Sequence, residues 1–255
     1  MKEKKLNLIF SIASVSLLLL FFFALYSAFK KMDYEWDFRA VISYFWQDGK
    51  PGLILQALWG TFYVSTTSIF FGSVFGIAFG LLLVSREPVA RKATYWYVEV
   101  FRNTPVLVQM YISYYVIGTL FNLSSLQAGI LTLSAFCAAY VAEIVRGTLQ
   151  QFEKGQIEAA KSIGLTPFQT YYLVIGPQAL RRMLPALVGQ FVSLVKDSSL
   201  VSVLGTVDLT KAALNIVAVS FRSFETWFVI ALLYLILNYS ISSLGRWLER
   251  KLAVA

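Results

Sequence analysis

The chain has 255 residues, of which 58% are hydrophobic and 14% are charged, and its mean hydropathy is +0.66. This is more apolar side chain than the core of one soluble domain can bury, so the composition excludes an ordinary soluble protein. A single cysteine, Cys137, and the absence of histidine exclude disulfides, zinc and haem centres, and hydrolases that need a catalytic imidazole. We therefore expect no metal site and no cofactor.

Apolar runs along the chain predict membrane-spanning helices, each of which needs about 20 mostly apolar residues. Residues 8–29 and 58–84 contain no ionisable side chain. Weaker runs at 95–121, 126–149 and 184–204 each hold one acid and one base, and a last run covers 224–244. The expected fold is an all-α membrane protein of about six transmembrane helices.

The first run follows Lys2, Lys4 and Lys5, as the core of a cleaved secretory signal would. A signal core has only about 7 to 15 apolar residues, so the length of this run favours a retained helix. Residues 30–56 mix charges with aromatic rings and predict an amphipathic segment at the outer membrane surface, either an anchor or a docking ledge for an extracytoplasmic partner. We divide the chain into an N-terminal unit, 1–55, and a transmembrane core, 56–255.

The second run carries a small residue at every fourth position, at Ser68, Gly72, Gly76 and Gly80. Such a face lets a neighbouring helix approach closely, and helix packing is its first interpretation. A small-residue face can also line a translocation path or a subunit interface, and the sequence does not separate these.

The distribution of Lys and Arg predicts the orientation, because positively charged loops stay on the cytoplasmic side. With both termini in the cytoplasm of a bacterial plasma membrane, most basic residues face inward: Lys2, Lys4, Lys5, Arg86, Arg91, Lys92, Arg146, Lys154, Lys161, Arg181, Arg182, Arg246, Arg250 and Lys251. This excess explains the net charge of +8 and suits contact with membrane lipids. Without an aromatic-basic stripe or zinc spacing, the charge does not indicate nucleic-acid binding.

Residues 150–183 form the longest predicted cytoplasmic segment. Glu158, Ala159 and Ala160 favour a helix, Gly164 offers a C-terminal cap, and Pro167 suits the first turn of a second helix. The pattern predicts two short helices that meet at a glycine. Such a hairpin outside the bilayer is well shaped to enter a groove on a partner.

This segment resembles the EAA loop of ATP-binding-cassette (ABC) importer permeases, in Glu158, Ala159, Ala160, Gly164 and Pro177. Residues 97–109, 177–182 and 194–200 are similar to the polar amino-acid branch of that family, the histidine, glutamine and glutamate type. The resemblance covers about residues 60–251. It implies a type I ABC importer-like permease fold, with a five-helix core and one added N-terminal helix.

The loop departs from the family pattern at its end. Val174 stands where the family usually has Ile, and Gly176 stands where it usually has Leu. Gly176 lacks a side chain that could anchor the coupling helix, which leaves the geometry of that turn open.

The resemblance also implies the function and the partners. The chain would be the permease subunit of an ATP-driven importer for polar amino acids, and no enzyme, since it has no phosphate-binding G-x-x-x-x-G-K-S/T loop. A cytoplasmic ATPase would grip the EAA loop and drive alternating access. The other implied partners are an identical or paralogous permease, an extracytoplasmic solute-binding protein and the amino-acid substrate.

Charged residues inside spans are costly unless they pair or line a wet cavity. Pro105 weakens its helix beside several polar residues, and such a break can build a mid-membrane site for an ammonium and a carboxylate. Alternatively, Glu99 with Arg102 and Lys196 with Asp197 only neutralise their own spans. The candidate substrate-binding residues are Glu99, Arg102, Asn103, Thr104, Pro105, Gln109, Lys196, Asp197 and Ser198.

Two other classes of protein stay in view. An ion-coupled secondary transporter would predict internal repeats with matching broken helices, which the sequence does not show. A membrane-embedded enzyme would need catalytic residues that converge at one interface, and the lack of histidine makes this harder.

Overall fold

A computed structural model describes residues 2–31, 34–152 and 154–253, which form two compact units, Met1–Asp37 and Phe38–Ala255. The first unit contains one long helix, α1 (Lys2–Lys31). Its stretch Ala13–Lys31 is long and apolar enough to cross a membrane, and no residue in its most apolar part is buried. The predicted helix at 8–29 is therefore confirmed.

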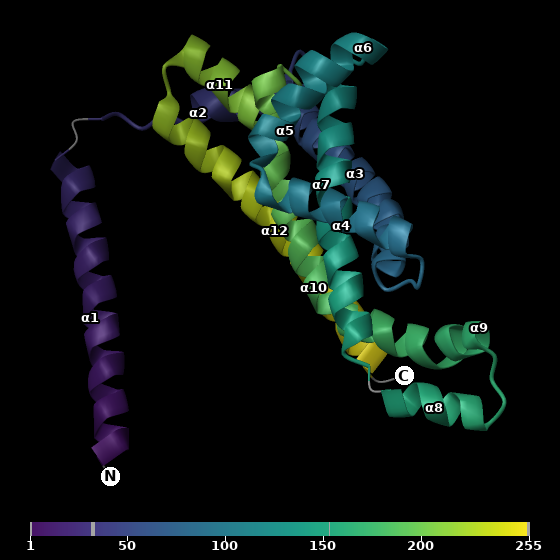
Figure 1. Cartoon of the computed structure of the whole chain (residues 1–255). Coiled ribbons are helices and arrows are strands. Elements are labelled where there is room, and N and C mark those ends of the chain that lie inside the picture. The colour runs from purple at the N-terminus through teal and green to yellow at the C-terminus, as the bar shows by residue number, and fades with distance from the viewer. Residues whose placement is uncertain (1, 32–33, 153, 254–255) are drawn as a thin grey trace. The chain divides into compact units, whose positions relative to one another are not determined.

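The second unit is built on four long helices, α3 (Leu53–Leu83), α7 (Ser125–Gln150), α10 (Gly176–Asp197) and α12 (Ser223–Ala253). Helix α7 packs against α3, α10 and the pair α4 (Pro88–Asn103) and α5 (Val106–Ile112) (Figure 1). Its apolar side chains Leu133, Cys137, Val141 and Val145 form the centre of the largest core cluster. This helix holds the core together because its neighbours bury it from several sides.

Shorter elements connect the long helices. They are α2 (Phe38–Ile42), η1 (Ser43–Phe45), β1 (Trp46–Gln47), β2 (Lys50–Pro51), η2 (Ser113–Gly118), α6 (Thr119–Phe121), α8 (Lys154–Ser162), α9 (Pro167–Gln169), η3 (Thr170–Ile175), η4 (Ser198–Leu204) and α11 (Leu209–Ser220). In the second unit, α8 and α9 lie at one end of the long helices, and α6 and α11 lie at the other (Figure 1). Strands β1 and β2 form an antiparallel pair in which Trp46 faces Pro51.

Among the described residues, five helical stretches are long and apolar enough to span a membrane, and a bent pair of helices makes a possible sixth. This agrees with the predicted number of about six. One span is bent, and one predicted boundary was wrong. In the run 95–121, whose helix Pro105 was predicted to weaken, α4 and the stretch Val106–Phe121 meet at 109°. The span predicted at 184–204 belongs to a longer stretch, Pro167–Leu204.

The small-residue face of α3 packs against α7. A Cβ atom added to Gly72 would lie 2.5 Å from Cys137 Cβ, and one added to Gly76 would lie 2.5 Å from Val141 Cβ. A Cβ on Gly80 would likewise overlap Val145, and Ser68 is fully buried. Helix packing, the first interpretation of this pattern, is therefore correct for this face. We call the contact the α3–α7 seam.

The predicted outer loop between residues 204 and 224 contains a helix that the sequence analysis missed. Helix α11 buries Leu209 and Ile216 in a second core cluster, together with Val41 from α2 and Ile54 from α3. Its length of 12 residues is well below the roughly 20 apolar residues that a span needs, so hydropathy does not reveal it. The segment around α2 is consequently part of a packed core, while Trp36 and Trp46 stay exposed. The domain division at residues 55 and 56 stays a prediction.

Candidate functional site

The break between α4 and α5 is centred on Pro105. Thr104 and Pro105 have extended backbone conformations, with ψ angles of 142° and 131°. Proline lacks an N–H and disfavours the helical conformation of the residue before it, which ends α4 at Asn103. The prediction that Pro105 weakens this helix is confirmed, and the helix is in fact interrupted.

Two side chains bind the backbone groups that the break leaves free. The Gln109 amide nitrogen donates to Phe101 O at 2.9 Å, to Thr104 O at 3.0 Å and to Thr104 Oγ1 at 2.7 Å. The Thr104 hydroxyl donates to Val100 O at 2.7 Å. Gln109 Oε1 is buried, and within the described part of the chain it has no hydrogen-bond partner. Thr104 and Gln109 thus stabilise the break and leave one acceptor beside it.

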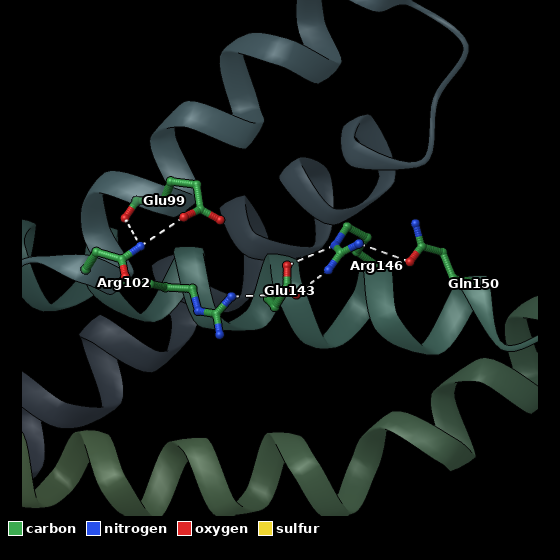
Figure 2. Close-up of polar contacts among 6 residues, drawn as sticks. Glu99, Arg102, Glu143, Arg146 and Gln150 are labelled. Atoms are coloured by element: carbon green, nitrogen blue, oxygen red, sulfur yellow. Dashed lines mark hydrogen bonds and ion pairs between the residues drawn. The ribbon is translucent and has the colours of Figure 1, made fainter.

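A chain of polar contacts joins the end of α4 to α7 (Figure 2). Arg102 Nη1 lies 3.6 Å from Glu143 Oε1, and Arg146 binds both oxygens of the same carboxylate, with Nε 2.9 Å from Oε2. Arg146 Nη1 also donates to Gln150 at 3.0 Å. The side chains of Arg102, Glu143 and Arg146 are about one-third exposed, at 36%, 27% and 34%. Two guanidinium groups therefore share one carboxylate.

The alternative that Glu99 and Arg102 neutralise each other within their span is not what the structure shows. Asn103 Nδ2 donates to Glu99 Oε2 at 3.0 Å, whereas Arg102 turns to α7 and also lies over the Tyr140 ring, 5.4 Å from its centroid. The structure thus places Glu99, Arg102, Asn103, Thr104, Pro105 and Gln109 around one break.

The sequence analysis noted Glu143 and Arg146 in an apolar run but did not include them in the site. Their spacing of three residues places them on one face of a helix, which is a usable signal of an ion pair. The third partner, Arg102, is far away in the sequence, so only the packing of α4 on α7 shows that all three meet.

The other predicted substrate-binding residues lie at the junction of α10 and η4. Ser198 is fully buried, donates to Val195 O at 2.8 Å and accepts a hydrogen bond from Ser65 Oγ at 3.1 Å. Lys196 lines a surface groove of about 290 Å³ with Ser199 and Tyr234. In the described residues no ion pair joins Lys196 to Asp197, and no hydrogen bond joins this group to the α4–α5 break. The nine candidates therefore form two groups, which no hydrogen bond or ion pair joins among the described residues.

The EAA-like segment forms a hairpin whose turn has the predicted caps. Gly164 has φ +85°, its N–H binds Lys161 O at 2.9 Å, and Leu165 N–H binds Ala160 O at 3.1 Å. This is the Schellman arrangement, which favours glycine because its φ is positive. Thr166 then caps α9 in a capping box with Gln169, and Pro167 occupies the first turn. Both sequence signals at this turn are confirmed.

The hairpin differs from the prediction in its second helix, which continues through η3 towards α10 as part of the stretch Pro167–Leu204. Glu158, Ala159 and Pro177 are exposed, while Ala160 is buried. The Gly176 N–H binds Tyr171 O, and a Cβ on Gly176 would lie 2.8 Å from that oxygen. Gly176 therefore fits a wide π-helical turn, which gives the departure from the family pattern a physical reason.

Residues 72–254 match the family described as "Binding-protein-dependent transport system inner membrane component". The chain belongs to this family. It is 34% identical to the glutamine transport system permease protein GlnP of Escherichia coli K12, over 79% of this chain and 94% of the relative. It is 37% identical to the probable glutamine ABC transporter permease protein GlnP of Bacillus subtilis, over 74% of this chain and 88% of the relative.

A solved structure agrees with these relatives. A chain in the crystal structure of an amino acid ABC transporter with histidines superposes with a TM-score of 0.77 at 33% identity, covering 86% of this chain and 100% of that chain. The type I permease fold is therefore confirmed. The protein is a multi-pass inner-membrane permease subunit of an ABC importer and no enzyme, since ATP hydrolysis resides in a separate subunit. An ion-coupled secondary transporter is not favoured.

Proposed function

We propose that this permease carries polar amino acids, and that a separate ATPase drives alternating access. The observation that carries the proposal is the group of acidic, basic and amide side chains around the α4–α5 break. An amino acid presents an ammonium and a carboxylate, so a site for it needs acceptors as well as donors. Support also comes from the names of the relatives, two of which are glutamine permeases.

Arg102 is our candidate for the substrate carboxylate. It shares Glu143 with Arg146, so the three side chains carry one excess positive charge. A guanidinium has five N–H donors, and Arg102 uses few of them in its contact with Glu143. Glu99 and the unpartnered Gln109 Oε1 are the candidate acceptors for the ammonium. Lys196, Asp197 and Ser198 would act as a second polar group farther along the path.

The exposed part of the hairpin is our candidate for the ATPase contact. Helix α8 presents Glu158 and Ala159, and Gly164 fixes the turn that follows. Because the backbone of this turn is capped at both sides, the hairpin could transmit a displacement to α10 as one lever. In this proposal both termini are cytoplasmic, a second permease completes the path, and an extracytoplasmic binding protein delivers the substrate.

The test is reconstitution of the permease with its ATPase and binding protein in proteoliposomes. We expect ATP-dependent uptake of labelled glutamine, glutamate or histidine, and much slower uptake of leucine as an apolar control. Equal uptake of leucine would contradict the proposed substrate class. Uptake that follows an ion gradient without ATP would contradict the proposed energy coupling, and a matched ATPase variant without activity provides that control.

A further inference from the structure

A groove of about 480 Å³ lies between the end of α3, the first half of α4 and the end of α7. Its polar lining consists of three cations, Arg91, Lys92 and Arg146, and two neutral groups, Tyr95 and Gln150. No carboxylate belongs to this lining among the described residues. Figure 2 shows Arg146 on α7 between the carboxylate of Glu143 and the side chain of Gln150. The groove is therefore strongly cationic.

Most of this positive charge is not neutralised by the protein. In the described part of the chain, Arg91 and Lys92 take part in none of the ion pairs, and both side chains are exposed. Arg146 uses three N–H groups on Glu143 and Gln150, which leaves two of its five donors. Donors in this number suit an anion with several oxygens, such as a phosphodiester.

Exposed apolar side chains lie beside one of the cations of the groove. Val89 and Trp96, which are 80% and 59% exposed, stand three and four residues from Lys92 and therefore share its face of α4. The groove also lies at the end of α3, where the apolar run of a membrane span stops. Exposed tryptophan and basic residues at this level are typical of the boundary between acyl chains and headgroups. A ligand that matches both the cationic groove and the apolar side chains beside it has an anionic head and apolar tails.

We propose that this groove binds the headgroup of an anionic phospholipid such as phosphatidylglycerol. Arg91 and Lys92 contact the phosphate, the free donors of Arg146 complete its coordination, and the acyl chains lie against the apolar neighbours. The charge rule assigns this end of the helices to the cytoplasmic leaflet, whose negative lipids attract juxtamembrane cations. Its ligand is a lipid and not the transported solute, so the site goes beyond the proposed function.

The test is native mass spectrometry of the purified full chain in detergent with added phosphatidylglycerol or phosphatidylcholine of equal chain length. We expect the wild type to retain phosphatidylglycerol preferentially, and the double variant Arg91→Gln/Lys92→Gln to retain about tenfold less. The double variant Arg250→Gln/Lys251→Gln removes the same charge outside the groove and should behave as the wild type. Lys92→Arg keeps the charge and should also retain the lipid.

Three results would overturn the proposal. The first is equal retention of phosphatidylglycerol by the wild type and the Arg91→Gln/Lys92→Gln variant. The second is an equal loss in the control variant, which would indicate an effect of net charge alone. The third is complete displacement of the lipid by inorganic phosphate, which lacks acyl chains and would identify the groove as a site for the free anion.

Discussion

Helix α7 has two very different contacts. Along the α3–α7 seam, Gly72 and Gly76 admit Cys137 and Val141 so closely that a single methyl group does not fit. On the α4 side, Glu143 meets Arg102 and Arg146 in a contact that is about one-third exposed. The seam is buried and closely packed, whereas the polar contact is partly open to its surroundings. One helix thus combines a tightly packed face with a partly exposed charged surface.

The largest effect is expected from a methyl group in the seam. Gly76→Ala places Cβ 2.5 Å from Val141 Cβ and 2.9 Å from Ala138 O, so α3 and α7 have to separate. We expect a loss of about 1 to 3 kcal/mol in the free energy of unfolding, measured by thermal unfolding in detergent. Gly147→Ala on α7, where a Cβ has open space, is the matched control. Equal stability of the two variants would show that the seam is not rigid.

The next effect concerns the hairpin beyond the end of α7, which is held by local caps rather than by a seam. Gly164→Ala forces a residue with a Cβ into φ +85°, at a cost of about 1 to 2 kcal/mol. We expect co-purification with the ATPase and ATP-dependent uptake to fall about fivefold. Gly155→Ala on α8 is the control, because its Cβ also has open space but no positive φ is recorded there. Gly164→Asn should recover part of the loss, since Asn tolerates this conformation.

A smaller effect is expected at the polar contact between α7 and α4. Glu143→Gln removes the carboxylate that Arg102 and Arg146 share, which leaves Arg102 free for the substrate carboxylate. For a partly exposed pair worth about 1 kcal/mol, we expect the apparent KM and the maximal uptake rate to fall, each about fivefold or less. Glu99→Gln leaves that pair intact and should instead raise KM. If both substitutions raise KM alike, Arg102 does not bind the substrate.

The smallest effect is expected at Asp208, outside the spans, where a buried carboxylate caps α11. Its oxygens accept hydrogen bonds from the Thr210 and Lys211 amides, but burial outweighs these bonds and raises the pKa of Asp208 above its ordinary value of 3.8. The folded state therefore favours the protonated form, so this contribution to stability is complete below pH 3.8 and is lost as the pH rises through the folded pKa.

Asp208→Asn keeps a capping oxygen and cannot ionise, so its unfolding temperature should lack that decline with pH. Asp208→Ala removes the cap and should be about 1 kcal/mol less stable than Asp208→Asn at every pH. Thermal unfolding of the three proteins across the acidic range measures both effects. Parallel curves for the wild type and Asp208→Asn would contradict the assigned titration.

The local features of the site were predictable because their causes lie within a few residues. Gly164 and Pro167 set the hairpin turn, and Pro105 ended its helix, as their backbone preferences require. Helix α11 escaped prediction since its apolar run is too short to stand out, and its burial depends on α3 and α12. The sequence also did not show that the second helix of the hairpin continues as the stretch Pro167–Leu204. The reason is related, because polar residues precede the apolar run at 184–204.

The amino-acid sequence alone was enough to predict a membrane protein of about six spans with a glycine-capped hairpin, because hydropathy and backbone preference act over neighbouring residues. It also showed the small-residue face of α3, though not the helix that fills it. The packing of the helices was needed to show that α7 is this partner, that Arg102 pairs with Glu143 and not with Glu99, and that the nine candidates form two groups. These outcomes depend on how helices distant in the sequence pack, and no local preference specifies which charges such packing brings together.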